Sequence, residues 1–119
     1  MIDRPLVLVV DDDADHTTML ELLLDAAGYR TIAATSCAEG GAALAANDVD
    51  VLVSDFTLGD GTAIDLLRRA AHKPRVAIVL TGFDSDEDVR RTRAAGYDAH
   101  LVKPASIDAL RHAIEAGLR

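Results

Sequence analysis

Leu6-Val7-Leu8-Val9-Val10-Asp11-Asp12-Asp13 joins five apolar residues directly to three aspartates. The apolar run is partly β-branched and does not alternate with polar residues, which predicts a strand buried on both faces of a sheet. The aspartates that end the run indicate that this first strand delivers carboxylates to its carboxyl end.

Four further apolar runs follow, and segments whose apolar residues recur at helical spacing separate them. The five runs predict strands at residues 6–10, 29–34, 51–53, 76–80 and 99–102. The other segments predict helices at residues 15–27, from 36 onward, 64–71, from a cap at Asp84 or Ser85 to 95, and 106–118. Gly28 and Gly96 are expected to stop two of these helices, and Ser36 to cap another.

The alternation of strands and helices predicts an α/β fold, a flavodoxin-like doubly wound (βα)5 sandwich with a parallel five-stranded sheet. Right-handed crossovers leave few topologies, and the order 2-1-3-4-5 is the expected one. A chain of 119 residues suffices for one core without disulfides, so residues 1–119 are expected to form a single domain.

Composition and charge exclude several classes of function. The chain carries 12 Lys and Arg against 20 Asp and Glu, a net charge of −8, which argues against the basic surface that nucleic-acid binding needs. Cys37 is the sole cysteine, and no apolar run is long enough to cross a bilayer. We therefore expect a cytoplasmic domain that binds neither nucleic acid nor membrane.

Polar residues stand where four of the predicted strands end. Asp11 and Asp12 follow the first strand, Asp55 the third, Thr81 the fourth and Lys103 the fifth. Because ligands of open parallel sheets bind outside the carboxyl ends of the strands, these side chains are expected to share one site. Neighbouring carboxylates raise each other's pKa unless a cation intervenes, and a partly hydrated cluster of oxygen ligands suits Mg²⁺.

The same set of residues suits phosphoryl transfer. A carboxylate can attack phosphorus and form an aspartyl phosphate, provided that positive charge surrounds the transferring group. A metal ion and Lys103 would supply that charge, and the hydroxyl of Thr81 would donate a hydrogen bond to a phosphoryl oxygen. The site thus contains a nucleophile, metal ligands, a hydroxyl and a cation.

From the first strand to the last helix, these motifs resemble the receiver domain of response regulators in two-component signalling. Asp11 and Asp12 match the family's acidic pair, and Asp55 in Val53-Ser54-Asp55-Phe56-Thr57-Leu58 matches its phosphoacceptor. Thr81-Gly82 matches the Thr or Ser that ends the fourth strand, and Lys103-Pro104 matches the Lys-Pro pair after the fifth. The chain looks most like receivers attached to hybrid sensor histidine kinases.

The resemblance implies a signalling domain rather than an enzyme. Asp55 would accept a phosphoryl group from the phosphohistidine of a histidine kinase or histidine phosphotransfer protein, and the domain would support its own dephosphorylation. Lys103, before a cis proline, would contact the phosphoryl group. Mg²⁺ would be held by Asp12, Asp55 and the backbone carbonyl of Thr57, with Asp11 acting directly or through water.

The resemblance also implies a switch made of Thr81 and His100. In the family, phosphorylation draws the Thr hydroxyl toward the phosphoryl group and shifts the face of helix 4, strand 5 and helix 5, which controls a partner. His100 stands where Tyr or Phe is common, so its ionisation near neutral pH would make the switch pH-sensitive. Gly59 and Ala63 also depart from the family, which usually has Pro and Gly there.

The chain has no room for an output domain, so it is expected to be either a stand-alone regulator or a module excised from a hybrid kinase, and the sequence does not identify its effector protein or domain. A monomer, or a dimer that forms on phosphorylation, is the expected state. Several polar residues are expected to have no part in the chemistry. Asp13 is expected to cap a helix or face solvent, Cys37 to be a small buried apolar residue, and His16, His72 and His112 to face solvent.

Two other functions fit some of these residues. A haloacid-dehalogenase-like phosphatase would use Asp11 as its nucleophile and Asp13 as its acid. That class wants Thr or Val where this chain has Asp15, which disfavours it. A receiver-like module that only docks other proteins is disfavoured because every chemical position is retained.

Overall fold

In the computed structural model, which describes residues 4–82 and 85–119, five strands and five helices alternate along the chain as the sequence predicts. The strands are β1 (Leu6–Val10), β2 (Arg30–Ala34), β3 (Val51–Asp55), β4 (Val76–Thr81) and β5 (Ala99–Val102). The helices are α1 (Ala14–Ala26), α2 (Cys37–Ala46), α3 (Ala63–Arg68), α4 (Asp86–Ala95) and α5 (Ile107–Leu118).

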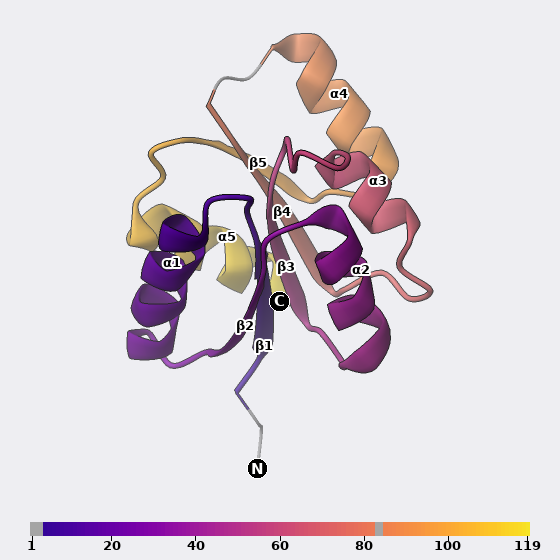
Figure 1. The fold of residues 1–119 in the computed structure, drawn as a ribbon. Coiled ribbons are helices and arrows are strands. Elements are labelled where there is room, and N and C mark those ends of the chain that lie inside the picture. The colour runs from indigo at the N-terminus through magenta and orange to yellow at the C-terminus, as the bar shows by residue number, and fades with distance from the viewer. Residues whose placement is uncertain (1–3, 83–84) are drawn as a thin grey trace.

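The strands form one sheet of order β2-β1-β3-β4-β5, and every neighbouring pair is parallel. Helices α1 and α5 cover one face of this sheet, and α2, α3 and α4 cover the other (Figure 1). The predicted doubly wound sandwich and its strand order are therefore confirmed. Because all strands run the same way, their carboxyl ends meet at one edge.

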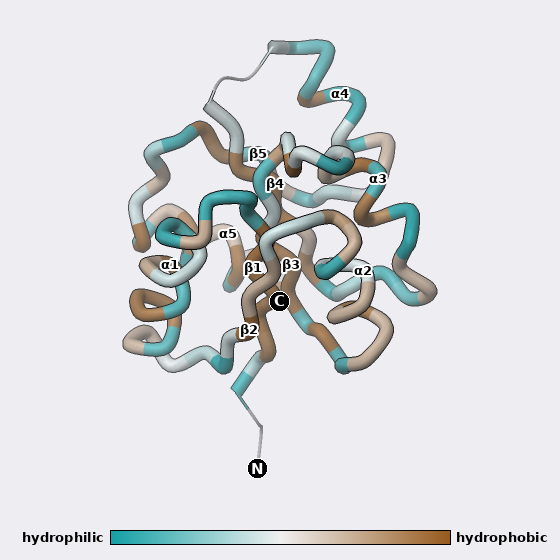
Figure 2. The backbone as a smooth tube through the Cα atoms, viewed as in Figure 1, coloured by the Kyte–Doolittle hydropathy of each residue, from teal (hydrophilic) through white to brown (hydrophobic). Residues whose placement is uncertain are grey.

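Two apolar layers hold the sheet between the helices. Alternate residues of β1 point into different layers: Val7 and Val9 pack with α1 and α5, whereas Leu8 and Val10 pack with α2 and α3. None of the four is more than 1% exposed. The strands are accordingly coloured mostly as hydrophobic residues, and hydrophilic segments lie beyond their ends (Figure 2). The rigid core thus fixes where each strand end lies.

Element boundaries agree with the sequence to within two residues except at α3. This helix ends at Arg68 instead of residue 71, because the N–H groups of Arg69 and Ala70 bond to carbonyls three residues back and tighten the last turn. Ser85 caps α4 with a 3.1 Å hydrogen bond from the Asp88 N–H, while the alternative cap Asp84 lies outside the described residues.

Cys37 is 0% exposed, which confirms the prediction of a small buried residue, and this burial raises the pKa of its thiol. Within residues 4–82 and 85–119, none of the helices has the length and apolar character needed to cross a bilayer.

Two helical glycines make the packing of the helices on the sheet testable. A Cβ at Gly117 in α5 would lie 2.5 Å from Cγ2 of Val76, a fully buried residue of the central sheet. We expect Gly117→Ala to lower the free energy of unfolding by about 1–3 kcal/mol, measured by urea denaturation, because overpacking outweighs the helix propensity of Ala.

Gly41→Ala in α2 is the matched control. A Cβ there would meet Cδ of Arg69 at 3.4 Å, an ordinary contact with a flexible side chain. This variant should gain about 0.5–1 kcal/mol from helix propensity alone. Equal effects of the two substitutions on the free energy of unfolding would contradict the packing of α5 against β4. The packing would also be contradicted if adding Val76→Ala failed to reduce the stability lost in Gly117→Ala.

Candidate functional site

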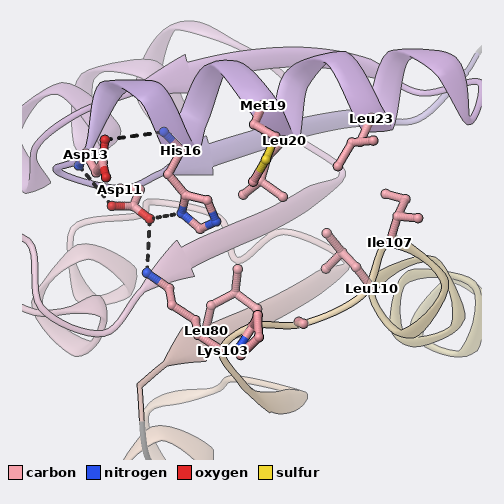
Figure 3. A pocket seen from close by; sticks show the side chains of 12 residues that line it. Asp11, Asp13, His16, Met19, Leu20, Leu23, Leu80, Lys103, Ile107 and Leu110 are labelled. Atoms are coloured by element: carbon pink, nitrogen blue, oxygen red, sulfur yellow. Dashed lines mark hydrogen bonds and ion pairs between the residues drawn. The ribbon is translucent and has the colours of Figure 1, made fainter.

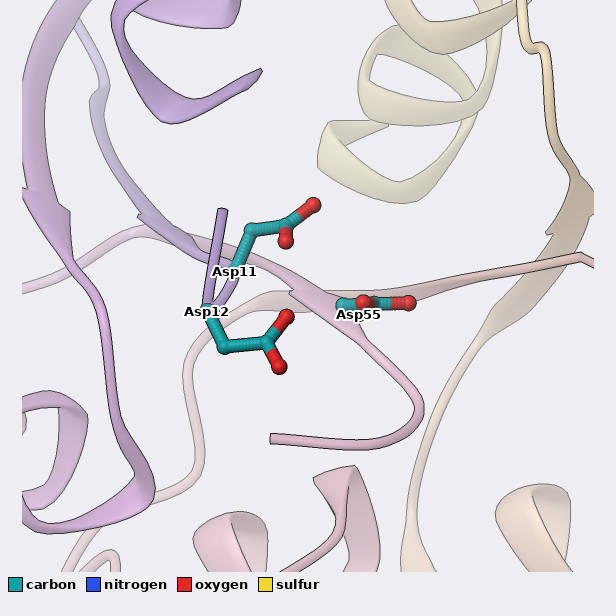
Figure 4. Close-up of side chains that lie close together, drawn as sticks. All are labelled: Asp11, Asp12 and Asp55. Carbon is teal, nitrogen blue, oxygen red and sulfur yellow. The ribbon is translucent and has the colours of Figure 1, made fainter. Parts of the chain in front are cut away.

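Three carboxylates converge where β1 and β3 end. Asp11 and Asp12 follow β1 directly, Asp55 is the last residue of β3, and one oxygen atom from each lies within 4.8 Å of the others. Figure 4 shows the three side chains approaching one another from these neighbouring chain segments. Asp11 is buried, Asp55 is half-buried and Asp12 is exposed. The acidic cluster predicted from the sequence is therefore present in the fold.

Lys103 connects two of these carboxylates. Its Nζ lies 3.2 Å from Oδ2 of Asp11 and 3.2 Å from Oδ1 of Asp55. The backbone N–H of Lys103 donates a 2.6 Å hydrogen bond to the carbonyl of Thr81, and the Lys103–Pro104 peptide bond is cis, as the resemblance implies. The structure thus brings Lys103 into the acidic cluster and places Thr81 at the adjoining strand end.

Asp11 has two further partners, neither of which the sequence predicts. Its Oδ1 accepts a 2.9 Å hydrogen bond from the Asp13 N–H, and its Oδ2 contacts Nδ1 of His16 in α1 (Figure 3). The expectation that His16 faces solvent is wrong, since its side chain is 23% exposed and turned toward Asp11. No motif marks this contact, which depends on how the first turn of α1 follows β1.

Burial and neighbouring charges give the three ionisable groups different proton affinities. For Asp11, burial raises the pKa, but hydrogen bonds from His16, the Asp13 N–H and Lys103 outweigh it and bring the pKa below its usual value. For Asp55, burial dominates over the attraction of Lys103, and its pKa is raised. For Lys103, burial lowers the pKa, yet the two carboxylates outweigh it and raise the value.

Two further residues predicted for the site are Thr57, which lies close to the acidic cluster, and His100, which does not contact it. Thr57 belongs to the loop that directly follows Asp55, and its neighbour Phe56 donates its N–H to Oδ1 of Asp55 at 3.0 Å. His100 lies farther down β5, where its Nδ1 meets Oγ1 of Thr92 in α4 at 3.3 Å. Its Nε2 is the one buried side-chain nitrogen or oxygen without a hydrogen-bond partner in the described part of the chain.

Asp13 takes the role of a helix cap. Its Oδ1 accepts hydrogen bonds from the N–H groups of Asp15 (3.0 Å) and His16 (3.4 Å) at the start of α1. The cap expected from the sequence is confirmed. An Asp13 carboxylate committed to this cap is poorly suited to the acid role that the phosphatase alternative requires.

An apolar groove opens beside the acidic cluster, between α1 and α5. Asp11, His16 and Lys103 line its polar end, and apolar side chains line the rest (Figure 3). The apolar members labelled there are Met19, Leu20, Leu23, Leu80, Ile107 and Leu110. Asp11 and Lys103 thus connect the acidic cluster to this groove.

Known proteins that are similar in sequence to this chain include a sensor protein and a transcriptional regulatory protein. The chain is 38% identical over 117 residues to the virulence sensor protein BvgS of Bordetella pertussis, an alignment covering 88% of this chain and 9% of BvgS. It is 32% identical to the transcriptional regulatory protein ZraR of Salmonella typhimurium, covering 94% of this chain and 26% of ZraR. The chain thus spans about a quarter or less of these relatives.

Solved structures give the same picture. A CheY-like response regulator receiver domain protein from Methanospirillum hungatei superimposes with a TM-score of 0.90 at 27% identity, covering 98% of this chain and 94% of the other. The profile described as response regulator receiver domain matches residues 7–115. With the acidic cluster, Lys103 and the strand order in place, the chain belongs to the family of response regulator receiver domains.

Proposed function

We propose that Asp55 accepts a phosphoryl group in a Mg²⁺-dependent reaction, and that this modification controls a partner protein. One observation carries the proposal: Asp11, Asp12 and Asp55 present oxygen atoms within 4.8 Å of one another, with Lys103 bound to two of them. Three carboxylates so close require positive charge beyond one ammonium group. A divalent cation and an incoming phosphoryl group together would balance the cluster.

The donor set fits Mg²⁺. All its candidate ligands are oxygen atoms, namely the carboxylates of Asp12 and Asp55, the carbonyl of Thr57, and Asp11 directly or through water. The exposed position of Asp12 leaves room for the waters that Mg²⁺ retains. When bound, the ion would neutralise charge on the transferring phosphoryl group.

Asp55 is the best candidate for the nucleophile because its carboxylate is exposed enough to meet a donor and lies beside the lysine. One of its oxygens attacks phosphorus, and the new P–O bond forms as the P–N bond to the donor histidine breaks. The electron pair returns to the imidazole nitrogen, which takes a proton from water. The ammonium group of Lys103 stabilises the negative charge on one phosphoryl oxygen throughout the reaction, and the Thr81 hydroxyl donates a hydrogen bond to a second phosphoryl oxygen.

The proposed output runs through β4 and β5. Thr81 would move toward the new phosphoryl group, and its carbonyl is already hydrogen-bonded to the backbone of Lys103 at the end of β5. His100 on the same strand contacts Thr92 of α4. A changed equilibrium at Thr81 would therefore bias the surface formed by α4, β5 and α5.

The donor proposed for the domain is a phosphohistidine on a histidine kinase or histidine phosphotransfer protein, and the effector is a separate protein or domain. Both relatives named above are signalling proteins by their names, a virulence sensor and a transcriptional regulator. A cytoplasmic setting and a monomer, or a dimer formed on phosphorylation, complete the proposal.

Phosphorylation can be tested directly with a small donor. Incubation with acetyl phosphate and Mg²⁺ should add the mass of one phosphoryl group, measured by intact-protein mass spectrometry. Asp55→Asn should abolish the label because it removes the nucleophile. Asp11→Asn should slow labelling without abolishing it, since the nucleophile remains.

The same experiment separates the alternatives. Loss of label in Asp11→Asn with retention in Asp55→Asn would favour the phosphatase assignment. An unlabelled wild-type chain, still folded by circular dichroism, would favour a module that only docks other proteins. Chelation of Mg²⁺ by EDTA should prevent labelling of the wild type.

The raised pKa of Asp55 also predicts an effect on stability without metal. A carboxyl group with a higher pKa in the folded state binds protons more readily when folded, so its ionised form destabilises the fold as pH rises through that value. We expect Asp55→Asn to raise the melting temperature at neutral pH in EDTA. Mg²⁺ at about ten times its Kd should stabilise the wild type by about 1.4 kcal/mol and the variant less.

Asp48→Asn serves as the control because Asp48 is exposed and lies between α2 and β3, at the opposite edge of the sheet. It removes the same charge and should leave both the melting temperature and the Mg²⁺ effect unchanged. A lower melting temperature for Asp55→Asn in EDTA would show that the Lys103–Asp55 ion pair outweighs burial and repulsion from Asp11.

A further inference from the structure

The loop between β3 and α3 folds back on itself as a short hairpin. The Leu58 N–H donates a 2.9 Å hydrogen bond to the carbonyl of Gly61, which closes a tip made of Gly59 and Asp60. Gly59 has a φ of +80°, a conformation that glycine adopts without strain and proline cannot adopt. The tip therefore has a defined backbone geometry.

Thr57 and Thr62 face each other across this hairpin as an antiparallel bridge. The hydrogen bond of Leu58 lies on one side of the bridge, and a 2.8 Å bond from the Ala63 N–H to the Phe56 carbonyl lies on the other. Both bonds are made by neighbours of Thr57. Thr57 thus belongs to a non-hydrogen-bonded pair, in which its own carbonyl is directed away from the facing segment.

Asp60 attaches the tip of the hairpin to α2, more than twenty residues earlier in the chain. Its Oδ1 accepts a 2.7 Å hydrogen bond from the Cys37 N–H, and its Oδ2 accepts a 3.0 Å bond from the Ala38 N–H. These are N–H groups of the first turn of the helix, which have no partner within it. The positive end of the helix dipole adds to the attraction for the carboxylate.

A second attachment lies on the other side of Gly59. Leu58 is 2% exposed and packs in the apolar layer between the sheet and helices α2 and α3. The hairpin is thus held by an apolar contact at Leu58 and by charge-assisted hydrogen bonds at Asp60. Thr57 lies between these attachments and Asp55, the end of β3, so the position of its carbonyl depends on both ends.

We propose that Asp60 is a positioning residue that fixes the backbone carbonyl of Thr57 for the divalent cation. This inference rests on the proposed function, since it takes the Mg²⁺ site as given. Asp60 does not touch the cation. It acts through the hairpin, by holding the tip against α2 so that the Thr57 carbonyl is set before the cation arrives.

Asp60→Ala removes both hydrogen bonds to α2, and Ser36→Ala is its matched control. Ser36 caps the same helix, with its Oγ accepting a 3.0 Å hydrogen bond from the Glu39 N–H, but its side chain makes no hydrogen bond to the hairpin in the described part of the chain. Mg²⁺ affinity is measured for each variant from the backbone amide NMR shifts of Thr57 and Leu58 during titration with MgCl₂. Hydrogen exchange of residues 57–61 is measured in EDTA.

We expect Asp60→Ala to weaken Mg²⁺ binding about tenfold and to speed hydrogen exchange in the hairpin, whereas Ser36→Ala does neither. Asp60→Asn, which keeps one acceptor oxygen, should fall between wild type and Asp60→Ala. Labelling by acetyl phosphate should require more Mg²⁺ in Asp60→Ala but reach the wild-type rate at saturation, a split that general destabilisation does not produce.

Equal loss of Mg²⁺ affinity in Asp60→Ala and Ser36→Ala would overturn the inference, because capping of α2 alone would then explain it. Unchanged affinity in Asp60→Ala would overturn it as well. A wild-type chain that binds no Mg²⁺ would instead refute the proposed function itself, and the inference with it.

Discussion

Electrostatic repulsion among Asp11, Asp12 and Asp55 is the constraint on which the site depends. A parallel sheet brings the carboxyl ends of β1 and β3 together, and the strands behind them are too deeply buried to move apart. The repulsion must therefore be balanced where it arises. Lys103 balances part of it, at 3.2 Å from two of the three carboxylates, and a Mg²⁺ ion with a phosphoryl group is our proposal for the rest.

Compensating contacts are distributed unequally between Asp11 and Asp55, and this difference separates the roles of the two carboxylates. Asp11 has both oxygens engaged, by His16 and Lys103 on one and by the Asp13 N–H on the other, and its pKa is lowered. Asp55 has fewer compensating contacts and a raised pKa. A carboxylate saturated with hydrogen bonds is a poor nucleophile, whereas one that is incompletely compensated gains most when a cation and an electrophile arrive. Local contacts thus favour Asp55 as phosphoacceptor.

The sequence predicts the parts of the structure that depend on local pattern or on strand order. Buried apolar runs predict the five strands, and the polar residue after each run predicts the edge at which Asp11, Asp55 and Lys103 meet. Contacts between helices and loops are not predicted, since no periodicity encodes them. His16 reaches Asp11 because of how α1 begins, and Asp60 reaches the N-terminus of α2 across 23 positions of the chain. The early end of α3 depends on hydrogen bonds in its last turn.

The site and the surface proposed as its output share strand β5. The Lys103 N–H binds the Thr81 carbonyl at 2.6 Å, and two positions before Val102, the partner of Thr81 in the sheet, His100 contacts Thr92 of α4. The Nδ1 of His100 lies within hydrogen-bonding distance of the Thr92 hydroxyl, which also has backbone carbonyls of α4 nearby, whereas the buried Nε2 has no hydrogen-bond partner in the described part of the chain. An unpartnered buried nitrogen is costly, so a displacement of β5 that brought Nε2 into contact with water would relieve that cost. In the proposed switch, a movement at Thr81 would thus reach α4 through β5 and the contact between His100 and Thr92.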